Sequence, residues 1–154
     1  MKLEPGTDAP DFELQDAEGR TWRLVDLRGQ KVVLYFYPAD DTPGCTAEAC
    51  DFRDTKSEFE NAGYQVLGVS PQGADSHAAF SSKFNLNFPL LIDTDMKVAE
   101  AYRAVREAPG DYKGIPLYIH RSTFIIDEDG KITEALYGVH GRGHVADIRK
   151  LINV

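Results

Sequence analysis

The chain has 154 residues, the size of one ordinary domain, and its content of 42% hydrophobic and 27% charged residues excludes wholesale disorder. The 25 acidic and 17 basic residues give a net charge of −8, which argues against nucleic acid as a partner because phosphate binding needs a basic footprint. No apolar run approaches the roughly 20 residues of a membrane-spanning helix, so no contact with a membrane is expected.

The N-terminal region is predicted to form a β-hairpin followed by a buried strand. Residues 12–14 and 21–24 flank the turn AEGR, as the two arms of a hairpin would. Residues 31–37 (KVVLYFY) form a nearly continuous run of β-branched and aromatic residues. Such a run is typical of a strand that is covered on both faces.

A helix and a second buried strand are predicted next. Thr42 is suited to the N-cap position, Pro43 to the first helical position and Gly63 to the end of the helix. Residues 64–70 (YQVLGVS) read as a strand. Strand, helix and strand together make a βαβ unit, whose crossover is nearly always right-handed.

Shorter elements are predicted in the second half of the chain. They are a helix at 74–84, a strand at 88–92, a short helix at 96–102, a loop at 107–116, strands at 122–126 and 131–137 around the turn DEDGK, and a helix at 144–152. The loop is expected because that stretch holds two prolines and two glycines. The whole pattern indicates an α/β fold, with a mixed β-sheet flanked by helices, in a single domain over residues 1–154.

The chain contains two cysteines, Cys45 and Cys50, in one segment. A secreted disulfide scaffold would carry more cysteines, spread along the chain, and a structural zinc site usually needs four ligands. The opening residues MKLEPGTDAPDF lack the apolar region of a signal peptide, so a cytoplasmic protein is expected. Two clustered cysteines in that compartment indicate reactive thiols.

Cys45 falls in the first turn of the predicted helix, just past the end of a buried strand. Ligands bind at the carboxyl ends of strands in such sheets, and a helix N-terminus presents free N–H groups and a partial positive charge. Both effects favour the nucleophilic thiolate. Nearby Asp40, Asp41 and Glu48 oppose it. A cation is therefore expected, and Arg121, at the mouth of the strand STFII, is the best candidate.

The spacing of the cysteines has a geometric consequence. Five residues of intact helix would separate the Cα atoms of Cys45 and Cys50 by roughly 8.7 Å. Disulfides need Cα atoms within about 7 Å. We therefore expect that a Cys45–Cys50 disulfide requires the first helical turns to unwind.

The segment PADDTPGCTAEACDFRD, preceded by VVLYFY, resembles the active-site segment of Q-type peroxiredoxins, the bacterioferritin-comigratory-protein group. Pro38, Thr42 and Cys45 match the peroxiredoxin pattern Pro-x-x-x-Thr-x-x-Cys. The similarity continues through APDFEL, YQVLGVSPQGADSHAAF, FPLLIDTD and RSTFIIDEDGKI. The resemblance implies a thioredoxin-like fold and a thiol peroxidase that needs no metal, haem or flavin.

The resemblance also implies a role for each matching residue. Cys45 would be the peroxidatic cysteine, and Cys50 would match the resolving cysteine of one subgroup. Thr42 would hydrogen-bond the peroxide, Pro38 would shield the thiolate from water, and Arg121 would polarise thiolate and substrate. The chain departs from the family in GIPLYIHR, where the spacer before the arginine is longer than usual, and this difference bears on peroxide preference.

The implied partners are hydrogen peroxide or an organic hydroperoxide, and thioredoxin or a similar dithiol. Resolution within one helix needs no second chain, so a monomer is expected. Two other functions stay open from the residues. A general disulfide oxidoreductase would be expected to carry Cys-x-x-Cys, whereas the spacing here is Cys-x-x-x-x-Cys. A redox-regulated binding or chaperone-like module would keep its partner after Cys45→Ser.

The remaining polar motifs receive structural interpretations. The histidines are expected to be surface or capping residues: His77, His120, His140 and His144. Trp22 and the seven tyrosines are expected in the core or at its rim. The run DTDMK is predicted to be a turn, because it lacks the ligand spacing of an EF-hand calcium loop.

Overall fold

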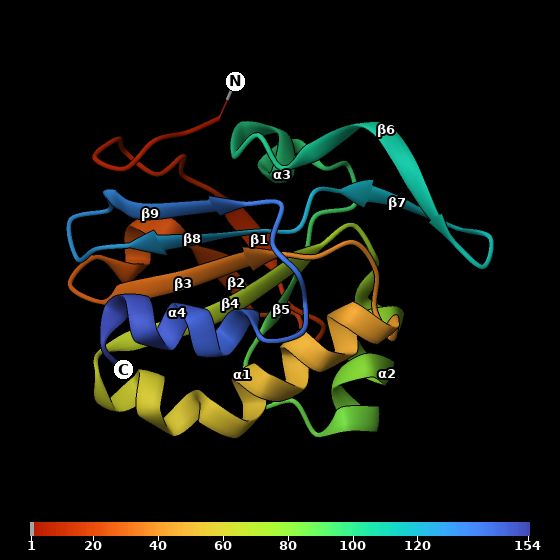
Figure 1. Ribbon diagram of the computed structural model, residues 1–154, viewed down its shortest axis with the longest axis horizontal. Helices are drawn as coiled ribbons and strands as arrows, with labels where there is room; N and C mark the ends of the chain where they lie inside the picture. The colour runs from red at the N-terminus through yellow and green to blue at the C-terminus, as the bar shows by residue number, and fades with distance from the viewer. Residues whose placement is uncertain (1) are drawn as a thin grey trace.

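The computed structural model describes residues 2–154 and is built around one five-stranded sheet in the order β5-β4-β3-β8-β9 (Figure 1). Its strands are β3 (Lys31–Phe36), β4 (Tyr64–Ser70), β5 (Leu90–Ile92), β8 (Ser122–Ile126) and β9 (Ile132–Tyr137). Strands β3, β4 and β5 are parallel neighbours, whereas β8 pairs antiparallel with both β3 and β9. The predicted mixed sheet is confirmed.

Helices cover the sheet as the alternation of elements predicted. They are α1 (Pro43–Asn61), α2 (Ala74–Phe84), α3 (Lys97–Ala101) and α4 (His144–Ile152), with a 3₁₀ turn η1 at Leu24–Leu27. Figure 1 shows α1, α2 and α4 grouped on one side of the sheet, and α3 beyond its other side. Among residues 2–154, no helix is both long and apolar enough to span a bilayer.

The strand β3 divides its side chains between two cores. Val33 and Tyr35 belong to the cluster beneath the helices, whereas Leu34 and Phe36 belong to the cluster on the opposite face. Successive side chains of a strand point to opposite faces, so a strand that is apolar throughout must be covered on both. This double burial places β3 at the centre of the sheet. The loop that follows β3 therefore starts from a fixed point.

Helix α1 begins where the sequence predicted. Thr42 has the extended backbone of an N-cap residue, and Pro43 occupies the first helical position. Thr46 N–H donates to Thr42 O at 2.8 Å, the first hydrogen bond of the helix. The Thr42 side chain makes no capping hydrogen bond, however, and this leaves it available to the site described below.

Two hairpins, one at each of the two smaller sheets, lie outside the central sheet. The predicted N-terminal hairpin is confirmed as β1 (Glu13–Gln15) paired antiparallel with β2 (Thr21–Arg23). The predicted loop at 107–116 is wrong, because this stretch belongs to a second hairpin.

That second hairpin consists of β6 (Val105–Tyr112) and β7 (Ile115–Ile119), and it projects from the body of the molecule (Figure 1). Lys113 and Gly114 both have positive φ, 49° and 85°, as a type I′ hairpin turn requires. Pro116 is tolerated because a two-stranded ribbon leaves its outer edges unpaired.

Candidate active site

The topology of the sheet brings the predicted site residues to one edge. Because β8 runs antiparallel to β3, Ser122 at the start of β8 pairs with Phe36 at the end of β3. Arg121 therefore emerges beside the loop that leads from β3 into α1. Cys45 lies in the first turn of that helix.

Arg121, the candidate cation of the sequence analysis, contacts the sulfur of Cys45 directly. Its Nη2 lies 3.1 Å from Cys45 Sγ, and its Nη1 donates to Glu48 Oε1 at 2.6 Å. Cys45 is only 1% exposed, and the side chain of Arg121 is 14% exposed. A guanidinium presents donors in a fixed fork, so a single side chain orients both the thiol and the carboxyl group.

Glu48 is a site residue whose place sequence reasoning missed. It is fully buried, and within the described residues its Oε2 has no hydrogen-bond partner. Burial raises the pKa of Glu48 to about 7, although the Arg121 guanidinium acts in the opposite direction. Its spacing of three residues from Cys45 places both on one face of the helix, a signal that could have identified it.

Thr42 and Pro38 lie in the loop before the helix. The hydroxyl of Thr42 donates to Ala39 O at 2.8 Å, so its oxygen keeps lone pairs that can accept a hydrogen bond. Thr42 is buried, and Pro38 is half-buried directly after the last tyrosine of the β3 run. The structure thus gathers Thr42, Cys45 and Arg121 in one place, with Pro38 at the end of the neighbouring strand.

Two carboxylates that were expected to oppose the thiolate are engaged elsewhere. Asp40 Oδ2 lies 2.7 Å from His77 Nδ1, and Asp41 forms an exposed ion pair with Lys83 at 2.7 Å. The prediction of a surface or capping role for His77 is wrong, because this residue is fully buried on α2.

His144 is the first residue of α4, but it is not a surface residue. It is 5% exposed, and its Nε2 lies 2.8 Å from Thr123 Oγ1. Burial lowers the pKa of His144 to about 4, so the ring is neutral near pH 7. His120 and His140 are more accessible, as expected.

A glycine-lined contact closes the other side of the site. Gly141 packs so closely on the first turn of α1 that a Cβ atom there would lie 2.1 Å from Gly44 O. A Cβ atom on Gly44 would in turn lie 3.1 Å from Arg121 Nη2. The backbone at residues 138–143 therefore fixes the position of the helix start.

Cys50 lies on the same continuous helix as Cys45, and both thiols are free. Cys50 is partly exposed, and burial is the main cause that raises the pKa of its thiol. With α1 intact over both positions, the geometric expectation of roughly 8.7 Å between Cα atoms applies, beyond disulfide range.

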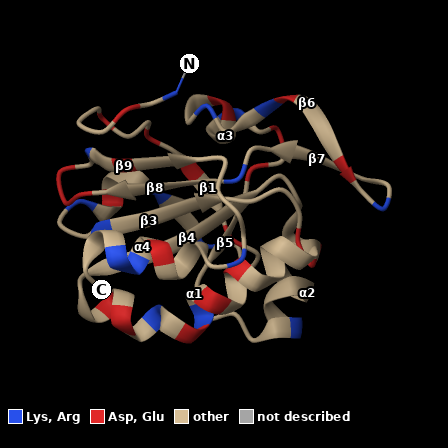
Figure 2. Cartoon of the chain, viewed as in Figure 1, with Lys and Arg blue, Asp and Glu red and all other residues tan. Residues whose placement is uncertain are grey.

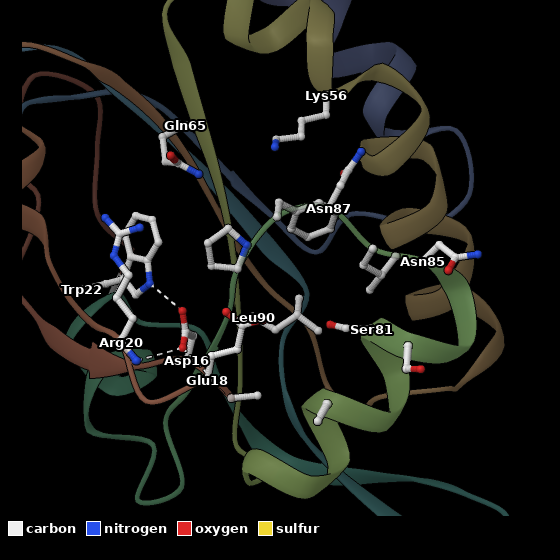
Figure 3. Close-up of a pocket in the computed structure, with 16 residues that line it drawn as sticks. Asp16, Glu18, Arg20, Trp22, Lys56, Gln65, Ser81, Asn85, Asn87 and Leu90 are labelled. Atoms are coloured by element: carbon white, nitrogen blue, oxygen red, sulfur yellow. Dashed lines mark hydrogen bonds between the residues drawn. The ribbon is translucent and has the colours of Figure 1, made fainter.

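A pocket of about 810 Å³ opens between the β1–β2 hairpin and α2 (Figure 3). Figure 3 shows Arg20 beside Trp22, and the Arg20 guanidinium carbon lies 3.9 Å from the ring centroid. Trp22 donates to Asp16 at 3.0 Å. None of the five predicted site residues lines this pocket, so the pocket is separate from the candidate active site.

Known proteins resemble this chain over most of its length. The AhpC/TSA family model matches residues 5–135. Peroxiredoxin Bcp of Bacillus subtilis is 43% identical over 96% of this chain and 93% of its own length.

Solved structures agree as well. A cysteine-to-serine mutant of Xylella fastidiosa PrxQ has a TM-score of 0.90 and 30% identity, covering 99% of this chain and 97% of its own. The Xanthomonas campestris bacterioferritin comigratory protein has a TM-score of 0.86 and 32% identity, covering 97% and 98%.

The chain belongs to the AhpC/TSA family. Its relatives and structural neighbours are Q-type peroxiredoxins of the Bcp group, and they share the thioredoxin-like fold that the sequence predicted. The chain is therefore a peroxiredoxin, a peroxidase that works through thiol chemistry.

Proposed function

We propose that Cys45 is the peroxidatic cysteine and that Cys50 resolves it. The observation that carries this proposal is a nearly inaccessible thiol at a helix N-terminus with a guanidinium nitrogen 3.1 Å from its sulfur. A small peroxide can reach such a thiol, whereas the disulfide of a protein substrate would need a more exposed sulfur. This difference favours a peroxidase over a general disulfide oxidoreductase.

The first step is attack of the Cys45 thiolate on one peroxide oxygen. The sulfur gains that oxygen and becomes a sulfenic acid, the O–O bond breaks, and the other oxygen leaves with a proton as water or an alcohol. Arg121 stabilises the negative charge on the sulfur and on the departing oxygen. Thr42 offers its oxygen as an acceptor for the peroxide O–H, because its own proton is already donated to Ala39 O.

The second step joins the two cysteines. The first turns of α1 unwind, the Cys50 sulfur attacks the sulfenic acid, water leaves, and a disulfide forms. A dithiol then reduces this disulfide by exchange and becomes oxidised itself; thioredoxin is the reductant we propose. Both thiols belong to one helix, so a monomer is sufficient for the cycle.

The substrate range includes organic hydroperoxides as well as hydrogen peroxide. The Xanthomonas campestris homologue is described as having alkyl peroxide reduction activity, and this chain aligns with it over 97% of its length. Competition between hydrogen peroxide and an alkyl hydroperoxide would measure the preference directly.

Peroxide consumption coupled to a thioredoxin system tests the whole cycle. Wild type should turn over, Cys45→Ser should be inactive, and Cys50→Ser should consume about one equivalent of peroxide and then stop. Ser57→Ala, an exposed position farther along α1, is the matched control and should behave as wild type. Sustained turnover by Cys45→Ser would overturn the role of Cys45, and sustained thioredoxin-dependent turnover by Cys50→Ser would overturn the role of Cys50.

A further inference from the structure

A buried polar network lies beside the active-site loop, and the proposed chemistry does not use it. At its centre is Asp40, whose side chain is 4% exposed. The Tyr37 hydroxyl donates to Asp40 Oδ1 at 2.5 Å, and the Ser76 hydroxyl donates to Oδ2 at 2.7 Å. His77 Nδ1 lies 2.7 Å from the same Oδ2. We call these four residues the Asp40 network.

His77 is held on both sides of its ring. Its Nε2 lies 2.9 Å from the backbone oxygen of Leu91 in β5. A carbonyl oxygen only accepts hydrogen bonds, so Nε2 carries a proton and donates it. A hydrogen bond between Nδ1 and Asp40 Oδ2 needs one further proton, and either the ring nitrogen or the carboxyl group can carry it. His77 therefore links the active-site loop to α2 and to the sheet.

The loop that Asp40 fixes has an unfavourable backbone. Asp41 has φ of 58°, in the left-handed region, which costs free energy for any residue with a Cβ atom although Asp tolerates it better than most. Its carboxylate pairs with Lys83 of α2, but both side chains are about half exposed, so water screens the pair. The buried contacts of Asp40 are thus the stronger tie that keeps the loop in this conformation.

The buried contacts of Asp40 matter because Asp40 is close to the reacting thiol along the chain. Asp40 precedes the N-cap residue Thr42 by two positions and Cys45 by five. Unwinding the first turns of α1 displaces the chain that joins Cys45 to this loop. Release of the strained Asp41 backbone would assist that movement, and the Asp40 network opposes it.

We propose that Asp40 and His77 are a positioning pair that restrains the opening of α1. The pair thereby sets how much of the Cys45 sulfenic acid becomes a disulfide and how much becomes a sulfinic acid. This inference rests on the Cys45–Cys50 cycle proposed above. In the closed form, a second peroxide can oxidise the Cys45 sulfenic acid to a sulfinic acid, releasing water or alcohol. In the open form, Cys50 forms the disulfide instead. A weaker tie should favour the disulfide.

Single-turnover oxidation tests the pair. Reduced protein is mixed with hydrogen peroxide, quenched with an alkylating reagent at increasing times, and analysed by mass for sulfenic acid, sulfinic acid and disulfide. His77→Leu fills similar space without bonding Asp40, and should form the disulfide about tenfold faster, because a buried hydrogen bond of the closed form is lost. The sulfinic fraction at excess peroxide should fall in proportion.

Three variants separate this effect from others. Ser76→Ala removes one neutral donor and should give a smaller acceleration in the same direction. Lys83→Ala removes the exposed tie on the same helix and should stay within twofold of wild type. Ile132→Val, a buried change in remote β9, controls for general destabilisation and should leave the partition unchanged.

A double-mutant cycle with Asp40→Ala and His77→Leu completes the design. The two changes should not be additive in the rate of disulfide formation, since both remove the same contact. If His77→Leu does not fold, Asp40→Ala alone should accelerate the disulfide. An unchanged disulfide rate in both variants would overturn the pair, as would an equal effect from Lys83→Ala or Ile132→Val.

Failure of the proposed cycle would look different. In that case wild-type protein would form no Cys45–Cys50 disulfide at all. Hydrogen exchange at the amides of residues 46–49, the first that the helix bonds, would still measure the opening of α1, and it should be about tenfold faster in His77→Leu. Unchanged exchange there would overturn the positioning pair independently of the fate of the cysteines.

Discussion

Arg121 has two partners in the site, and this arrangement depends on the shape of its side chain. Its Nη1 and Nη2 contact Glu48 Oε1 and Cys45 Sγ at 2.6 and 3.1 Å. The contact with the buried carboxyl group of Glu48 fixes the guanidinium plane, and the remaining nitrogen is thereby directed at the sulfur. A lysine would present one nitrogen on a flexible stem in place of a fork.

Arg121→Lys should therefore slow the reaction of Cys45 with hydrogen peroxide. Loss of one charge-assisted hydrogen bond predicts a second-order rate constant about ten- to a hundredfold lower. Competition kinetics against a reference peroxidase would measure this constant for wild type and variant. Arg142→Lys, an exposed arginine in the loop at 138–143, is the control. A rate constant within twofold of wild type would show that the fork geometry is unimportant.

At the scale of elements, the start of α1 is fixed by a backbone contact, while its later turns are fixed by aromatic packing. Phe52 is fully buried and stacks on Tyr35, with ring centroids 4.7 Å apart. The first turn has no such side chain, and Gly141 lies against Gly44 O instead. Unwinding is thus expected to stop before Phe52, which would remain in the core.

Gly141→Ala should displace the start of α1. The new Cβ atom would lie 2.1 Å from Gly44 O, so one of the two backbones must move. We expect a loss of stability of about 1–3 kcal/mol, as for other overpacked sites, together with slower peroxide reaction because Gly44 adjoins Cys45. Thermal unfolding and peroxide kinetics measure the two effects. Arg142→Ala is the neighbouring control, and wild-type values for Gly141→Ala would contradict the close contact.

The elements also show what could be predicted from the sequence. The start of α1 was predictable because Thr42 and Pro43 are local signals, and strand β3 because its apolar run is local too. The β6–β7 hairpin was missed because its prolines and glycines look like a loop, and only pairing between the strands makes them regular.

Contacts across the fold depend on topology more than on local pattern. Arg121 reaches Cys45 through the antiparallel register of β3 and β8, which supports a prediction that the sequence alone left open. The contact between Asp40 and His77 spans 37 residues of chain and has no periodic signature. Burial of His77 could therefore not be expected from its own neighbourhood.

At the scale of the whole molecule, two of the ionisable groups that lie beneath the acidic surface, Glu48 and His144, have opposite character. Figure 2 shows acidic and basic residues interspersed along α1, and water can screen the charges of those that are exposed. Glu48 and His144 lie inside, and burial favours the neutral form of each. Their contributions to stability consequently change with pH in opposite directions.

The direction in which folding changes each pKa decides whether that group stabilises the protein at low or at high pH. The pKa of Glu48 rises from 4.5 to about 7 on folding, so its contribution to stability is present below pH 4.5 and is lost as the pH rises to 7. The pKa of His144 falls from 6.5 to about 4, so its contribution is present above pH 6.5 and is lost as the pH falls to 4. The two effects oppose each other between pH 4.5 and 6.5.

Single variants should reveal the pH dependence of the unfolding free energy that each group contributes, because the two contributions partly cancel in wild type. Relative to wild type, Glu48→Gln should gain stability as the pH rises from 4.5 to 7, by up to about 3 kcal/mol. His144→Gln should gain stability relative to wild type as the pH falls from 6.5 to 4. Denaturant unfolding from pH 4 to 8 measures both, with the exposed variant Glu60→Gln as the control. A difference between Glu48→Gln and wild type that does not grow with pH would mean that Glu48 is already ionised in the folded protein, held by Arg121.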